Sequence, residues 1–223
     1  EIGVVRDLLS KLVVEGHVFT TDALLTQREL AEDILERGGD YVFVVKRNQP
    51  QLHADIALLF ESPPPLPRDE TWPEAERGTA GHGRIERRWL KSSTLLNDYV
   101  DFPGVKQVFR VQRRVLKKKT GEVTTQSVDG VSSLSPAEAD AARLLTFVRQ
   151  HWHVENKSHW IRDMVFDEDQ AQTRQGQLPQ VMATLRNALI GLMRASGIQG
   201  ITRARRRFAA RPDEAISLLG IAA

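Results

Sequence analysis

The feature that most constrains this chain is a strand–helix–strand pattern within its first 47 residues. Residues 17–21 (HVFTT) form a short β-branched segment, and residues 40–47 (DYVFVVKR) contain a second apolar run. Between them, residues 26–37 have the period of an amphipathic helix that two glycines end. Strands joined by one crossover helix pair in parallel, so the pattern predicts an α/β fold with these two strands parallel and interior to the sheet.

Further helices are predicted from hydrophobic periodicity. They cover residues 4–13, 51–60, 135–165 with one break, and 178–195. Two helix starts have the spacing of a capping box, in which a hydroxyl residue precedes a glutamate by three positions. These are Thr26 with Glu29 and Ser135 with Glu138.

The pattern changes at Ser62-Pro-Pro-Pro-Leu-Pro67, because consecutive prolines cannot continue a helix. Beyond it, residues 84–90, 105–116 and 122–131 have the composition of exposed antiparallel strands. We expect one domain over residues 1–223, in which 62–134 is a β-rich insertion and 198–223 a basic helical tail.

Composition excludes several classes of site. The chain has no cysteine, which rules out disulfides, zinc–cysteine centres and thiol catalysis and fits a reducing cytoplasm. No apolar run approaches the roughly 20 residues that a membrane span needs, so no membrane partner is expected. The formal net charge is only +2, yet basic residues gather between 106 and 119 and between 203 and 211, a distribution that suits phosphate contacts or a solvated surface.

Two carboxylates are the candidate metal ligands. Asp22 follows the first predicted strand, where α/β sheets place their ligands, although an aspartate there also suits a turn. Glu155 lies late in the chain within a predicted helix. Mg²⁺ prefers carboxylate oxygens, and paired ions can promote phosphodiester chemistry when about three carboxylates converge. The sequence offers no convincing third carboxylate.

The segment around Glu155 is unusually rich in functional side chains. If it is helical, the helical period places His151, Glu155, His159 and Arg162 on one face. Its tryptophans suit packing against a sheet. A zinc pair formed by His151 and Glu155 has little support, because no HExxH motif is present.

Several segments together resemble the ISAs family of DDE-superfamily insertion-sequence transposases. They are TTDALLTQ (20–27), GGDYVFVVKRNQ (38–49), HGRIERR (82–88), SSL (132–134) and, most specifically, RQHWHVENKSHWIRDMVFDED (149–169). The resemblance implies an RNase H-like fold in which Asp22 is the second acidic residue and Glu155 the glutamate of the triad. The first aspartate and the first strands of the sheet would precede Glu1, which makes this chain the C-terminal part of the catalytic domain.

The same resemblance implies Mg²⁺, with Mn²⁺ as a substitute, and double-stranded DNA of transposon ends and target. It also implies a homodimer in a synaptic complex and a nucleoid-associated protein of the bacterial cytoplasm. The residues expected to contact DNA are Lys46, Asn48, Gln49, Arg84, Arg87, His151, Asn156, His159 and Arg162. Related transposases carry a Tyr–Arg–Glu–Lys signature, of which only the charge at Arg162 is kept. For the polar residues after the second strand, and for Arg84 and Arg87, a solvated or salt-bridged surface is the alternative.

The expected reaction is phosphodiester cleavage and strand transfer in the intact protein, with little activity from this chain alone. Two other functions remain open. One is a DNA-binding remnant of a truncated element that has no catalytic activity. The other is an unrelated metal-dependent nuclease that takes its third carboxylate from Asp163 or Asp167.

Overall fold

Residues 2–65, 71–81, 83–154, 160–172 and 175–220 are described by the computed structural model of the chain. They fall into two units, Glu1–His151 and Trp152–Ala223. The first unit contains every strand of the described residues, and the second is helical.

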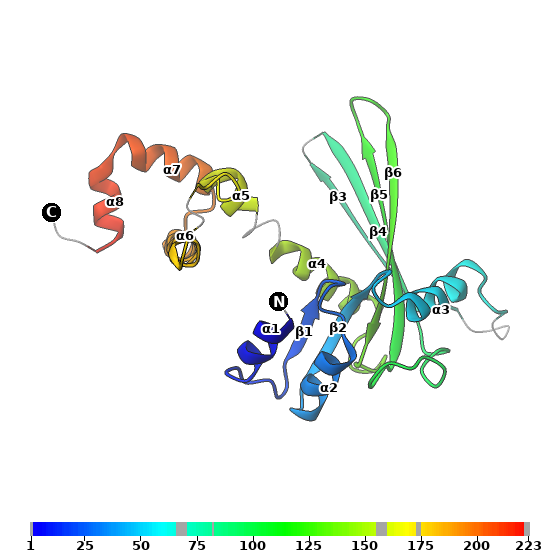
Figure 1. The fold of residues 1–223 in the computed structure, drawn as a ribbon. Coiled ribbons are helices and arrows are strands. Elements are labelled where there is room, and N and C mark those ends of the chain that lie inside the picture. Colours follow the sequence, from blue (N-terminus) through cyan, green and yellow to red (C-terminus); the bar gives the residue numbers. More distant parts are fainter. Residues whose placement is uncertain (1, 66–70, 82, 155–159, 173–174, 221–223) are drawn as a thin grey trace. The chain divides into compact units, whose positions relative to one another are not determined.

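The first unit is built on one mixed six-stranded sheet with the order β1-β2-β6-β5-β4-β3 (Figure 1). The strands are β1 (Val18–Thr21), β2 (Asp40–Val45), β3 (Glu74–Gly81), β4 (Arg84–Ser93), β5 (Gln107–Lys117) and β6 (Val123–Ser132). β1 and β2 are parallel, as predicted, and all other pairs are antiparallel. The prediction that β1 is interior is wrong for the described residues, because β6 pairs with the other side of β2 and β1 lies at the end of the strand order.

Helices cover both faces of this sheet. On one face, α4 (Ala141–Val154) contributes Leu144 to a core that also contains Phe109 of β5. On the other face, α1 (Ile2–Leu9), α2 (Arg28–Glu36) and α3 (Pro50–Glu61) share a core in which Ile34 and Ile56 surround Phe43 of β2. The two apolar faces of β2 explain its uninterrupted run of hydrophobic residues, and the architecture is the expected mixed α/β, RNase H-like one.

Gly130 allows three strands to meet closely at the centre of the sheet. It lies in β6, where the register pairs it with Val44 of β2 on one side and with Phe109 of β5 on the other. A Cβ at this position would collide with the Phe109 ring and would stand 2.6 Å from the Phe43 carbonyl oxygen. Glycine is therefore required because the aromatic ring occupies the space of the missing side chain.

Both predicted capping boxes are wrong as helix starts. α2 begins at Arg28 with Gln27 as its N-cap, because the Thr26 hydroxyl donates to carbonyl groups instead. After Ser135 the chain makes a turn in which Glu138 accepts from the Ser135 amide at 2.8 Å. The helix begins only at Ala141, where Asp140 Oδ1 accepts a hydrogen bond from the Arg143 amide at 2.8 Å.

The strands expected between residues 62 and 134 are present as β4, β5 and β6, and β3 joins them although it was not predicted. Polar and glycine-rich residues make β3 almost fully exposed, which removes the alternating pattern that identifies a strand. These strands continue the sheet of β1 and β2. The boundaries of a separate insertion stay a prediction.

The second unit contains α5 (Trp160–Phe166), α6 (Leu178–Ala195), α7 (Ile201–Ala210) and α8 (Pro212–Leu218). Its core combines Ile161 and Val165 of α5 with Ile190 of α6 and Ile201 of α7. In the described part of the chain, no helix is both long enough and apolar enough to cross a membrane.

Candidate functional site

Asp22 stands where the two parallel strands end. Thr21, the last residue of β1, is paired with Phe43 of β2, so both strands reach the same edge of the sheet. Asp22 follows as an exposed residue, and its Oδ1 accepts a hydrogen bond from the Leu25 amide at 3.3 Å. Lys46, which is also exposed, follows β2 at this edge. The sequence thus correctly placed a carboxylate and a cation at one sheet edge.

The loop carrying Asp22 is fixed by one polar side chain of its own, that of Thr26, and by two amide side chains that follow β2. The hydroxyl of Thr26, which is fully buried, lies 3.0 Å from the Asp22 carbonyl oxygen and 2.7 Å from that of Val44. The Asn48 amide donates to the carbonyl of Ala23, and Gln49 Nε2 donates to that of Thr26 at 3.1 Å. DNA contacts by Asn48 and Gln49 stay predictions, and both amides have a role within the chain.

Replacing Thr26 by valine should lower the free energy of unfolding by about 1–3 kcal/mol, because buried carbonyl groups lose their donor while the side-chain shape is kept. Urea denaturation of the purified chain measures this. Thr26→Ser retains the hydroxyl and should recover most of the loss. A valine variant as stable as the unaltered chain would show that the hydroxyl does not hold the loop.

The C-terminal part of α4 reaches the same edge of the sheet. His151 Nδ1 lies 3.4 Å from the hydroxyl of Thr20 in β1, although the two residues are 131 positions apart. Glu155, Asn156 and His159 lie outside the described residues. Among the residues that are described, no group of three histidine, aspartate or glutamate side chains forms a metal cluster.

The donor set at this edge suits a hard divalent cation. Asp22 offers carboxylate oxygens at an exposed strand end, and within the described part of the chain the contact found for Oδ1 is the long one of 3.3 Å with the Leu25 amide. Carboxylate oxygen with several retained waters is the ligation that Mg²⁺ and Mn²⁺ take. A single described carboxylate does not complete such a site, and further ligands are needed.

Beyond this edge, β3, β4, β5 and β6 continue as an arm (Figure 1). Val45, the last residue of β2, is paired with Asp129, and residues 123–128 of β6 extend past it for roughly 20 Å at about 3.4 Å per residue. The predicted DNA ligands Arg84 and Arg87 both belong to this arm. Their spacing of three places them on opposite faces of β4, and Arg87 lies 3.7 Å from Glu76 of β3.

Glu86 organises two arginines on the α4-facing side of the arm. It is buried, its Oε2 accepts from Arg113 of β5 at 3.0 Å, and its Oε1 is in contact with Arg88. Burial alone would raise the pKa of Glu86, but the Arg113 hydrogen bond and the charges of Arg88, Arg113 and Arg84 outweigh it and lower the pKa below its ordinary value.

The lowered pKa of Glu86 predicts an acid-sensitive contribution to stability. Its folded-state pKa lies below that of the unfolded chain, so its stabilising effect is complete above about pH 4.5 and is lost as the pH falls through the folded-state value. Glu86→Gln should therefore be less stable than the unaltered chain at pH 7, and the difference should shrink towards pH 3. Denaturant titrations at both pH values measure this. A difference that grew on acidification would contradict it.

In the second unit, the predicted DNA ligand Arg162 is engaged within the chain. Its Nε and one terminal nitrogen each lie 2.5 Å from an oxygen of Glu168. The hydrogen bond with Glu168 raises the pKa of Arg162, and this effect outweighs burial, which alone would lower the pKa. A phosphate contact by Arg162 stays a prediction, and it would compete with Glu168.

The basic tail also pairs internally. Arg207 and Arg211 both contact Glu214, at 2.5 and 3.0 Å, and Arg205 lies 3.8 Å from Asp167. These ion pairs reduce the positive charge that the tail sequence suggested.

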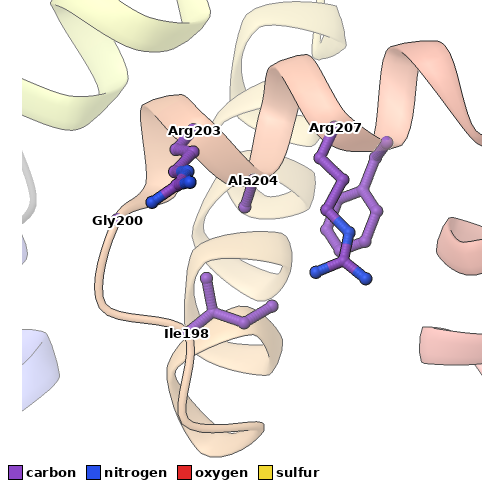
Figure 2. A pocket seen from close by; sticks show the side chains of 6 residues that line it. Ile198, Gly200, Arg203, Ala204 and Arg207 are labelled. Carbon is purple, nitrogen blue, oxygen red and sulfur yellow. The ribbon is translucent and has the colours of Figure 1, made fainter.

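An apolar pocket of about 420 Å³ that includes Ile198 lies beside α7. Arg203 and Arg207 project from α7 next to it (Figure 2).

Comparison with known proteins identifies relatives for most of the chain. The family described as "Transposase DDE domain" matches residues 1–190. Two Escherichia coli K12 proteins, YbfL and YhhI, are each 32% identical over 206 residues, covering 86% of this chain and 51% of the relative. YhhI is provisionally named an H repeat-associated transposase. YncI of E. coli O157:H7, provisionally named a transposase, is 27% identical over 217 residues, covering 93% of this chain and 53% of its own length. The chain therefore spans about half the length of these relatives.

Proposed function

Because this chain belongs to the DDE transposase family, we propose that it supplies part of the catalytic centre of an insertion-sequence transposase of the ISAs type. The reaction would be phosphodiester cleavage followed by strand transfer at the element's ends. Transposon-end and target DNA would be its substrates, and a homodimer in a synaptic complex at the bacterial nucleoid would be its working form.

Asp22 and Glu155 are the proposed metal ligands. The contact between His151 and Thr20 carries this proposal, because it brings the end of α4 to the end of β1. Asp22 follows Thr20 by two residues, and Glu155 follows His151 by four, the spacing that places two side chains on one face of a helix. Bound Mg²⁺ would supply activation of the attacking water or 3′-hydroxyl and stabilisation of the leaving oxygen.

The chain's own residues would fix the geometry around these ligands. Thr26 and Asn48 hold the loop backbone so that the Asp22 carboxylate stays at the strand end. Lys46, which is exposed at the same edge, is proposed to contact a phosphate of the bound strand. His151, Asn156 and His159 are proposed to contact DNA beside Glu155.

A third carboxylate is required, and we propose that it comes from a segment outside these 223 residues. The test compares nicking of supercoiled DNA in Mg²⁺ by this chain and by the same chain extended at its N-terminus with the corresponding segment of YhhI. Nicking by the extended protein, with little from the chain alone, is the expected result. Full activity of the chain alone would contradict the need for an outside carboxylate.

Other outcomes distinguish the alternative functions. DNA binding without nicking by either protein, unaffected by Asp22→Ala or Glu155→Ala, would favour a non-catalytic DNA-binding remnant. Loss of Mg²⁺-dependent nicking on Asp163→Asn would favour an unrelated nuclease. The pairing of Asp167 with Arg205 at 3.8 Å argues against Asp167 as the alternative ligand, because metal binding would have to break it.

A further inference from the structure

The two faces of the arm formed by β3, β4, β5 and β6 differ in charge. Paired residues of antiparallel strands lie on the same face, so the strand register assigns each side chain. The α4-facing side carries Arg77, Arg84, Arg88 and Arg113, which together we name the arginine face. The opposite side carries Arg87, Lys91, Arg114, Glu74 and Glu76.

Among the described residues, acidic partners offset more of the positive charge on the opposite side of the arm than on the arginine face. Arg87 lies 3.7 Å from Glu76, and Lys91 lies 3.8 Å from Glu74. On the arginine face the carboxylate between Arg88 and Arg113 is that of Glu86, which is buried. The register also places Lys117 on this face, where it lies 2.8 Å from Glu122. Among the described residues, five basic groups therefore stand against two carboxylates there, and an anionic partner is attracted to this face.

The arginine face lies on the same side of the sheet as the contact between β1 and α4. α4 packs on that side, and the chain's residue Thr20, beside Asp22, meets His151 there. Leu90 of β4 and Val111 of β5, which lie on the same face as Arg88 and Arg113, share a core with Leu144 of α4. The strands of the arm extend beyond the end of β2 (Figure 1). The arginine face therefore begins beside α4 and continues outward along the arm.

We infer that the arginine face holds the sugar–phosphate backbone of duplex DNA flanking the cleaved position, and that the opposite face of the arm does not contact it. A surface roughly 20 Å long would follow about six base pairs, at about 3.4 Å per base pair on each strand. Glu86 is the positioning residue: its two ion pairs hold Arg88 and Arg113 extended across the strands. This inference rests on the proposed function, because it assigns a surface to the same DNA substrate.

Two matched double variants of the 223-residue chain test the assignment. Arg77→Gln with Arg84→Gln removes two exposed arginines from the arginine face, and Arg87→Gln with Arg114→Gln removes two exposed arginines from the opposite face. The net charge changes equally in both. Binding to a fluorescent 30-base-pair duplex is measured by anisotropy between 50 and 200 mM salt, and thermal unfolding is compared to ensure that each variant is folded.

The first variant should bind roughly tenfold more weakly, with the slope of log affinity against log salt smaller by about 2, because each phosphate contact contributes about 0.9 to that slope. The second variant should bind within about twofold of the unaltered chain. Equal losses in the two variants, a greater loss in the second, or no loss in either would overturn the inference while leaving the proposed function intact. Failure of the unaltered chain to bind duplex DNA would contradict both.

Discussion

Replacing Asp22 by asparagine is expected to abolish Mg²⁺-dependent DNA nicking while leaving the fold unchanged. Asparagine keeps an oxygen that can accept the hydrogen bond of the Leu25 amide, so the turn after β1 survives. The charge that attracts a divalent cation is lost, and metal assistance of several kcal/mol corresponds to a decrease in rate of about a thousandfold or more. The measurement is nicking of supercoiled DNA by the form of the protein that cleaves it.

Asp98→Asn provides the matched control, because it makes the same chemical change at an exposed aspartate away from the strand ends. Its activity should equal that of the unaltered protein. DNA affinity without metal should be unchanged in both variants, which separates metal binding from DNA binding. Full nicking by Asp22→Asn would exclude Asp22 as a metal ligand and would assign it to the turn alone.

Replacing Asp129 by alanine should destabilise the chain more than any other single change proposed. Asp129 is 3% exposed and lies opposite Arg110 in the β5–β6 register. Both of its oxygens accept hydrogen bonds from the Arg110 guanidinium, at 2.6 and 2.8 Å. Removing the carboxylate leaves a half-buried cation without its main partner, which costs about 3–5 kcal/mol. Urea denaturation at neutral pH measures the change.

A double variant without either charge separates the loss of attraction from the penalty of the remaining charge. Arg110→Met with Asp129→Leu removes both charges and fills the space with apolar groups, so it should be clearly more stable than Asp129→Ala alone. The exposed pair of Lys117 and Glu122, 2.8 Å apart, serves for comparison, and Glu122→Ala should change stability by less than about 1 kcal/mol. An equally small effect of Asp129→Ala would show that the buried ion pair does not stabilise the sheet.

Local signals predicted some parts of the structure and failed for others in a consistent way. The apolar run of residues 40–47 identified β2, since a strand covered on both faces needs hydrophobic residues throughout. β3 escaped prediction because an exposed strand has no burial pattern to reveal it. The capping prediction at Thr26 failed because a hydroxyl near a helix start can equally donate to buried carbonyl groups, and only the packing of the loop against β2 selects between these uses.

The candidate site shows the same division. Asp22 was placed at a strand end from the sequence alone, because a short β-branched segment followed directly by an acidic residue is a local pattern. The strand predicted over residues 84–90 already placed Arg84 and Arg87 on opposite faces, because they are three residues apart. Only the pairing of β4 with β3 and β5 showed that these two faces differ in charge. The internal roles of Asn48 and Gln49 had no local signal, because their partners lie more than 20 residues away.

The amino-acid sequence by itself determined the parallel pairing of β1 and β2, the presence of the later antiparallel strands and the position of Asp22 at the end of β1. Each depends on periodicity and composition within one short segment or one connection. Tertiary structure alone decided that β6 joins β2, that the arm continues past the edge bearing Asp22, and that His151 meets Thr20. These contacts join residues 80 or more positions apart, and they arise from burying shared apolar surface, which is a property of the folded chain as a whole.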